Sequence, residues 1–511
     1  MHSNLMAAVY SQISTAGQTL DVSADTFYRY LQTYQQYPGY QQPILHHTLF
    51  SSYAHLKDFE TATDHVERCV VLLFCAAIGA IYCSEPTTAR KMRDVAKTAL
   101  AQLLGQNSFK WEKAEDVESV LHVLQARLLC AVFDAWSGDR ELVEMALNEQ
   151  LLWIRMCTKC TLSKFRRVTS DWRRWIVRES FHRVYWGCFS LISDFNMAYG
   201  DITPEPVVST RLFPLPEADA LWDAEDPSSW QQQIRVCEAP LTADVIIAKI
   251  VGEVEAGGHQ RARESRFCEA SAFATCVLLR FVMHHVSASE QVFNSQVLSK
   301  GLDPECEKIT QYLRQLSGQQ IDRLLADLSI RSMKFTHSPT KFSIESLIQS
   351  IELRRRRLVT SKKLGVLCSI LIESDRNQIL GDFLSSKTMK SEQVCQAVTI
   401  CLKYIEPYAV SGTRMRTFKE LVCTWESVLL IIMWLRTMVN AGVHTETERS
   451  AVEQVKQTVA KFPAEAGVVE DGTAELARRM ARVWRRVLQE TQSYGTSYMM
   501  LQFFDQLADL L

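Results

Sequence analysis

Apolar residues recur along most of the chain at the three- and four-residue spacing that is typical of amphipathic α-helices. Near the N-terminus, Phe27, Tyr30, Leu31 and Tyr34 would share one helical face, and Pro38 ends the pattern. The same spacing predicts helices over 60–84, 89–104, 117–136, 140–157, 170–196, 239–255, 261–286, 304–328, 344–374, 391–410 and 415–439, and a final helix over 473–492. No alternating apolar and polar run is long enough to predict a strand.

Short turns between these segments, such as Ser137-Gly138-Asp139, indicate antiparallel helix pairs. No fixed internal period is found, so a regular solenoid is not expected. We therefore predict an all-α fold, a multi-helical irregular bundle or array of antiparallel helix pairs. Residues 1–25 are polar and are expected to form a loose lead-in.

The most apolar early segment, 69–84, is uncharged but shorter than a membrane span needs, so we interpret it as a buried core helix. Its small residues Ala76, Ala77, Gly79 and Ala80 would allow a neighbouring helix to approach closely.

Five prolines interrupt the segment 199–230, which is therefore expected to be irregular. Its acidic part, 217–226, surrounds Trp222, and such mixtures of acidic and aromatic residues can act as activation segments. The alternative, which we favour, is an ordered loop that anchors Trp222 and Trp230 in the core.

Composition narrows the function classes. Of 511 residues, 47% are hydrophobic and 22% are charged, with a formal net charge of -2. A stand-alone nucleic-acid binder usually has a basic excess, because phosphate contacts supply much of its affinity. The 15 cysteines form no compact framework, and 1–20 lacks a signal-peptide pattern, which together favour a reducing compartment.

Candidate chemistry is sparse. Cys157 and Cys160 form a lone Cys-x-x-Cys pair without the further ligands that structural zinc requires. The neighbours in His46-His47 and in His284-His285 would point about 100° apart on a helix, so neither pair is expected to share a metal. No phosphate-binding loop, nucleophile elbow or His-Glu-x-x-His motif occurs. We predict no catalytic, cofactor-binding or metal-binding residues, and no enzyme.

One basic run stands out. It consists of Arg354, Arg355, Arg356, Arg357, Lys362 and Lys363. Such a run can serve as a nuclear import signal or a contact for acidic partners. It also lies inside a predicted helix, where a solvated face is the simpler interpretation, and we favour that one.

Two ordered sets of residues resemble a known family. The first is an aromatic helix followed by Pro43-Ile44-Leu45-His46 and the apolar stretch 72–82; the second is the tryptophan-rich helix 171–195 and the Pro/Trp segment after it. The motif residues are Pro43, His46, Trp172, Trp175, Glu179, Arg183, Trp186, Pro216, Trp222 and Trp230. Their order resembles the fungal-specific transcription factor domain, also called the middle homology region.

The resemblance implies a regulatory helical core over 26–240 and a helical continuation of the same region over 241–511. It implies a protein that is located in the nucleus, either there alone or in the cytoplasm as well. It also implies control of a metabolic or secondary-metabolite gene set. Expected partners are other transcription factors or co-regulators, with homo- or heterodimers and no membrane. The family's zinc module is not found before Thr26, so zinc is expected only in a module outside this chain. Contact with promoter DNA is expected only indirectly or through such a module.

Two alternatives remain open at this point. The first is a scaffold or decoy that lacks DNA binding and dimerises with a full-length factor. A less favoured alternative is a helical small-molecule sensor or enzyme, since a core rich in cysteine and tryptophan could hold a pocket.

Overall fold

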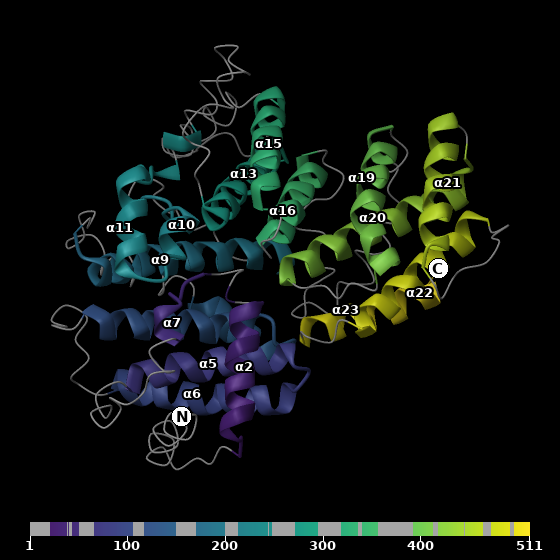
Figure 1. The fold of residues 1–511 in the computed structure, drawn as a ribbon. Helices are drawn as coiled ribbons and strands as arrows, with labels where there is room; N and C mark the ends of the chain where they lie inside the picture. Colours follow the sequence, from purple (N-terminus) through teal and green to yellow (C-terminus); the bar gives the residue numbers. More distant parts are fainter. Residues whose placement is uncertain are drawn as a thin grey trace, which may run out of the picture. The chain divides into compact units, whose positions relative to one another are not determined.

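The computed structural model describes residues 21–37, 39, 43–50, 66–105, 117–149, 170–199, 213–243, 245–247, 271–294, 318–335, 340–355, 392–411, 417–443, 445–462, 472–490 and 495–510. These residues are almost all helical, and their only β-type pairing is an isolated bridge between Pro214 and Thr242 (Figure 1). The predicted all-α class is confirmed.

The helices have the following bounds: α2 (Ala24–Gln36), α5 (Val66–Tyr82), α6 (Pro86–Gly105), α7 (Val117–Ala135), α9 (Trp172–Tyr199), α10 (Asp219–Trp222), α11 (Pro227–Val236), α13 (Ala272–Asn294), α15 (Gly318–Ser332), α16 (Thr340–Arg355), α19 (Glu392–Ser411), α20 (Phe418–Ala441), α21 (Glu446–Ala460), α22 (Thr473–Glu490) and α23 (Gly495–Leu510). A 3₁₀ turn covers Met333–Phe335.

The chain divides into two compact units that are interleaved in sequence. The first unit contains Met1–Ile192, Pro206–Leu278 and Phe335–Thr340. The second contains Ser193–Glu205, Leu279–Lys334 and Lys341–Leu511. This division is separate from the family-based boundary after residue 240, which stays a prediction.

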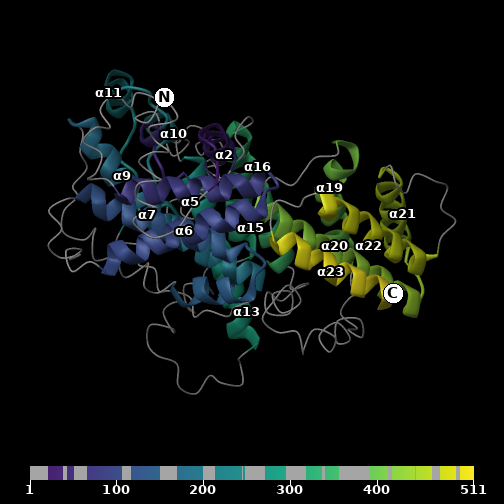
Figure 2. The same cartoon turned by 90° about the horizontal axis from the view of Figure 1, so that it is seen from below.

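In the first unit α5 packs against α2, α6 and α7 (Figures 1 and 2). Every residue of α5 from Cys69 to Ala80 is buried, which confirms the predicted core helix. A Cβ atom built on Gly79 would lie 2.0 Å from the backbone oxygen of Tyr30. Only glycine therefore lets α2 and α5 approach this closely, as the small residues of α5 suggested.

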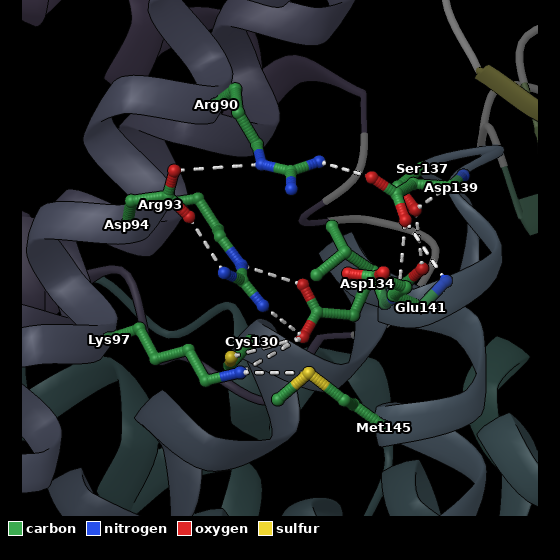
Figure 3. A network of polar contacts seen from close by, with 11 residues as sticks. Arg90, Arg93, Asp94, Lys97, Cys130, Asp134, Ser137, Asp139, Glu141 and Met145 are labelled. Carbon is green, nitrogen blue, oxygen red and sulfur yellow. Dashed lines mark hydrogen bonds and ion pairs between the residues drawn. The ribbon is translucent and has the colours of Figure 1, made fainter.

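A buried ion pair joins α6 to α7 (Figure 3). Arg93 donates from Nε and Nη2 to the two carboxylate oxygens of Asp134, at 2.7 and 2.6 Å, and both side chains are about 95% buried. Arg90 adds a bond of 3.0 Å to Asp139 in the turn after α7. A two-pronged Arg–carboxylate contact fixes distance and orientation together, so it sets the register of α6 on α7.

The C-terminal end of α5 closes with a Schellman motif that has serine where glycine is usual. Ser84 N–H donates to the carbonyl of Ile81, and Glu85 N–H donates to the carbonyl of Ala80, both at 2.9 Å. Ser84 has a φ of 63°, in the left-handed region that favours glycine.

Replacing Ser84 with glycine is expected to raise the free energy of unfolding of the first unit by about 0.5 kcal/mol, because the unfavourable contact of Cβ in this conformation disappears. Urea denaturation would measure it. The converse substitution Gly138→Ser, at a glycine with a φ of 72°, is the matched control and should destabilise. A stabilising effect of both substitutions would contradict this explanation.

In the second unit α20 packs against α19 and α22, and α22 also packs against α21 and α23. The indole rings of Trp425, Trp434 and Trp484 are fully buried there. The stretch Lys419–Val439 of α20 is long and apolar enough to cross a membrane, but 89% of it is buried inside the protein, as is typical of a core helix.

Several sequence predictions need correction. The helix α22 is not the last one, because α23 follows it. The proline-rich segment is not irregular up to Trp230, since α10 and α11 form within it. Residues 239–242 are not helical. The remainder of the helices predicted over 239–255 and 344–374 lies mostly outside the described residues, as does 150–157.

Candidate functional site: the buried motif core

The helix α9 carries a row of charged residues that are buried. Asp171 caps its start by accepting a hydrogen bond from Arg174 N–H at 3.2 Å. One turn later come Arg178, Glu179, His182 and Arg183, each at most 4% exposed. Charged side chains are almost never buried unless they are paired, so their partners define the site.

Arg183 connects three segments of the first unit. Its Nε donates to Glu179 Oε1 at 2.8 Å, one helical turn back. Its Nη2 donates to the carbonyl of Glu217 at 3.2 Å, and its Nη1 donates to the carbonyl of Pro43 at 3.4 Å. The guanidinium carbon lies 3.9 Å from the ring centroid of Trp222, a cation–π contact. Arg183 thereby saturates most of its donors inside the core.

Glu217 ties the proline-rich segment to α9. Its backbone N–H donates to Glu179 Oε1 at 3.0 Å. Its side-chain Oε1 accepts from Arg178 Nη1 at 3.2 Å and from Trp175 Nε1 at 3.3 Å. Two carboxylates and two guanidiniums therefore alternate within one buried cluster, which offsets much of the cost of removing them from water.

Aromatic rings enclose the charged groups. Trp175, Leu221, Trp222 and Trp230 are buried in one apolar cluster, with Trp172 partly buried against it. The rings of Trp175 and Trp230 have centroids 5.8 Å apart. The preferred interpretation of the acidic segment is therefore supported in one respect: Trp222 and Trp230 are anchored in the core, although by α10 and α11 and not by a loop.

Trp186 and the segment before Glu217 extend the site. Trp186 Nε1 donates to the carbonyl of Pro214 at 2.8 Å, and Leu215 N–H donates to the carbonyl of Leu241 at 2.9 Å. Asp219 accepts from Ala272 N–H, at the start of α13, at 2.8 Å. The carboxylate thus sits at the positive end of a helix dipole.

The two neighbouring histidines, His46 and His47, have different contacts. His46 is buried, its ring centroid is 4.8 Å from that of Trp222, and its Nδ1 accepts from Thr48 N–H at 3.3 Å. His47 Nε2 donates to the carbonyl of Ala224 at 2.9 Å. The two residues lie before the helical residues 48–50 and are not themselves helical, so the helical-spacing argument used above does not apply to them. In the described part of the chain, no three His, Cys, Asp or Glu side chains converge as metal ligands.

Burial decides the protonation of the titratable groups. It lowers the pKa of His46 to about 3, with further lowering by the charges of His47 and Arg183. It lowers the pKa of His182 to about 3 as well, helped by Arg178. Both imidazoles are therefore neutral near pH 7. For Glu179 burial raises the pKa to about 7 against the opposing effect of Arg183.

The structure brings the motif residues of the sequence together in one unit of the protein. They are Pro43, His46, Trp172, Trp175, Glu179, Arg183, Trp186, Pro216, Trp222 and Trp230, which we call the motif core. Sequence reasoning missed Arg178, His182 and the pairing role of Glu217. Glu217 lies 38 residues after Glu179, and no spacing rule connects two such positions.

One member of the basic run, Arg354, is placed differently from either interpretation made for the run. Arg354 is 1% exposed and forms an ion pair with Glu426 on α20, with Nη2 2.5 Å from Oε1. The side chain of Arg355 and residues 356, 357, 362 and 363 lie outside what the structure describes. Arg354 is therefore a core residue of the second unit, and a role in import stays a prediction for the others. Cys157 and Cys160 also lie outside the described residues.

Two family models match the chain, one after the other. The family model "Fungal specific transcription factor domain" matches residues 24–325, more than half of the 511 residues, and "Fungal transcription factor C-terminal domain" matches residues 363–506. The curated relative "Transcription factor MYCGRDRAFT_87993" of Zymoseptoria tritici (strain CBS 115943 / IPO323) is 26% identical over 118 residues. That alignment spans 21% of this chain and 12% of the relative. No solved structure matches. The chain belongs to the family of fungal specific transcription factor domains.

Proposed function

We propose that this chain is the regulatory part of a fungal transcription factor and changes transcription through contacts with proteins or a ligand. The observation that carries the proposal is the family match over residues 24–325. The second match, over residues 363–506, supports a regulatory role for the C-terminal half as well.

The motif core favours a regulator over an enzyme. Glu179 and Arg183 are completely buried, and their hydrogen bonds go to other core groups. A catalytic acid, base or anion-binding group has to reach substrate, which these side chains do not. We infer that the charged motif residues hold the helices in one arrangement, and that regulation acts on this arrangement.

The partners and location follow as parts of the same proposal. We expect the chain to act in the nucleus on other transcription factors or co-regulators, and to reach promoter DNA only indirectly. The formal net charge of -2 supports this, because it gives no general attraction to phosphate. A scaffold or decoy role would need a full-length partner, which sizing with related factors would reveal.

Fusing the chain to an unrelated DNA-binding domain is expected to change the output of a reporter gene carrying that domain's operator, relative to the DNA-binding domain alone. Reporters for activation and for repression should both be used. The matched control is the same fusion with Asp134→Ala, which removes the buried, two-pronged partner of Arg93 and should lose the effect at equal protein abundance. No change in either reporter would contradict the proposal.

A gel-shift titration of the isolated chain on promoter fragments is expected to show no sequence-selective binding. Selective binding that persists as salt is added would contradict indirect action, because non-specific phosphate contacts weaken steeply with salt.

A further inference from the structure

Two neighbouring buried polar atoms on α9 have no hydrogen-bond partner among the described residues. Glu179 Oε1 accepts two hydrogen bonds, from Arg183 and from the backbone of Glu217, but its Oε2 accepts none. His182 Nδ1, one turn along the same helix, is also buried and without a partner. The two atoms lie 3.9 Å apart. That distance is about 1 Å too long for a hydrogen bond, so a small side-chain rotation would join them.

A single proton resolves both deficits. In the Nε2–H tautomer of the neutral imidazole, Nδ1 is an acceptor, and an ionised Oε2 opposite it would be a second buried acceptor, which is unfavourable. The Nδ1–H tautomer would donate to an ionised Oε2, but that carboxylate would then leave a net negative charge in the core. A proton on Oε2 turns it into a donor aimed at Nδ1. The proton does not belong to the imidazole, because burial and the neighbouring Arg178 both disfavour a charged His182.

The charges around the site point the same way. The charged groups around Glu179 come from three elements. Arg178 and Arg183 lie on α9, and Glu217 lies in the segment before α10. Asp219 lies on α10 and interacts with Arg183. His46 also faces Arg183 and is neutral, and Asp223 faces it from an exposed position. If Glu179 is neutral, the charges of Arg178 and Arg183 are balanced by those of Glu217 and Asp219. An ionised Glu179 would leave a net negative charge in the core.

We infer that Glu179 binds a proton on Oε2 and shares it with His182 Nδ1, so that the motif core is a proton-binding site whose stability responds to pH. The folded state then holds a proton that the unfolded chain releases at lower pH, since the Glu179 pKa is raised to about 7 from a usual value of 4.5. Stability from this group is complete below about pH 4.5 and is lost as pH rises through about 7.

Substituting Glu179→Gln tests the inference in the full chain. Glutamine keeps an acceptor for Arg183 and the Glu217 backbone, and its amide can donate permanently to His182. We expect the melting temperature of the variant to exceed that of the natural chain by about 5 °C at pH 8, and the difference to vanish near pH 4.5. A lower melting temperature at pH 8 would show that the ionised carboxylate is the native form and would overturn the inference.

The matched control is Glu217→Gln, which neutralises the neighbouring carboxylate and leaves Arg178 without its counter-ion. It is expected to lower the melting temperature at pH 8. A second measurement uses the natural chain and does not depend on the folding of any variant. Infrared difference spectra between pH 6 and pH 8 should show the carbonyl band of a buried carboxylic acid, and this band should fade as the pH rises. Absence of that band would also overturn the inference.

Discussion

Replacing Gly79 with alanine is expected to separate α2 from α5 and to lower the free energy of unfolding of the first unit by about 3 kcal/mol, the upper end for overpacked cores. The new Cβ would lie 2.0 Å from the oxygen and 2.8 Å from the carbon of the Tyr30 carbonyl. Both are backbone atoms of a helix, which cannot rotate away as a side chain would. Urea denaturation followed by circular dichroism would measure the loss.

The control for this substitution is Gly105→Ala at the end of α6. A Cβ atom there meets nothing within 4 Å, so the change should be less than about 1 kcal/mol and favourable if helix propensity dominates. Equal losses from the two substitutions would mean that the cost arises from alanine itself and not from the contact with Tyr30.

Replacing Glu426 with alanine is expected to destabilise the second unit by about 3–5 kcal/mol. The substitution leaves Arg354 as a buried cation, and a guanidinium cannot escape this cost by losing its proton. The Ser350 carbonyl, which accepts from Arg354 Nη1 at 3.4 Å, is neutral and cannot replace the lost carboxylate. Thermal and chemical denaturation should both show the loss.

The double substitution Arg354→Met with Glu426→Leu is expected to recover most of that stability, because it removes both charges together. The surface pair Arg449–Glu446 on α21 provides the second comparison: its atoms are 2.8 Å apart, but both side chains are largely exposed. Replacing Glu446 with alanine should have no measurable effect. A double variant as unstable as the single one would locate the cost in packing and not in charge.

The core helices α5 and α20 were predictable because nearly continuous apolar runs of helical length leave few alternatives. The helix α23 was missed although its apolar positions Met500, Phe503, Phe504 and Leu507 follow the helical spacing. The helices α10 and α11 were hidden by the prolines around them. Pro227 begins α11, where a proline is favourable, so its presence argued wrongly against a helix.

The motif core was predictable in part. The spacing of Glu179 and Arg183 places them one turn apart on a helix, where the structure shows a hydrogen bond of 2.8 Å from Arg183 Nε to Glu179 Oε1. That both would be buried, and that Glu217 and the Pro43 carbonyl would complete their shell, depends on contacts up to 140 residues apart in sequence. Arg354 presents the same difficulty, because composition alone makes a basic run look solvated.

The interleaving of the two units governs how the chain can be synthesised and cut. The first unit includes residues up to Leu278 and again from Phe335 to Thr340, while residues Ser193–Glu205 belong to the second. A ribosome therefore has to pass residue 340 before the first unit is complete. A fragment ending at residue 240 would lack the start of α13, whose Ala272 N–H binds Asp219. Fragments that end at a sequence-based domain limit such as residue 240 should therefore be easily degraded by proteases. Fragments that end beyond residue 340 contain the whole first unit and should be more resistant.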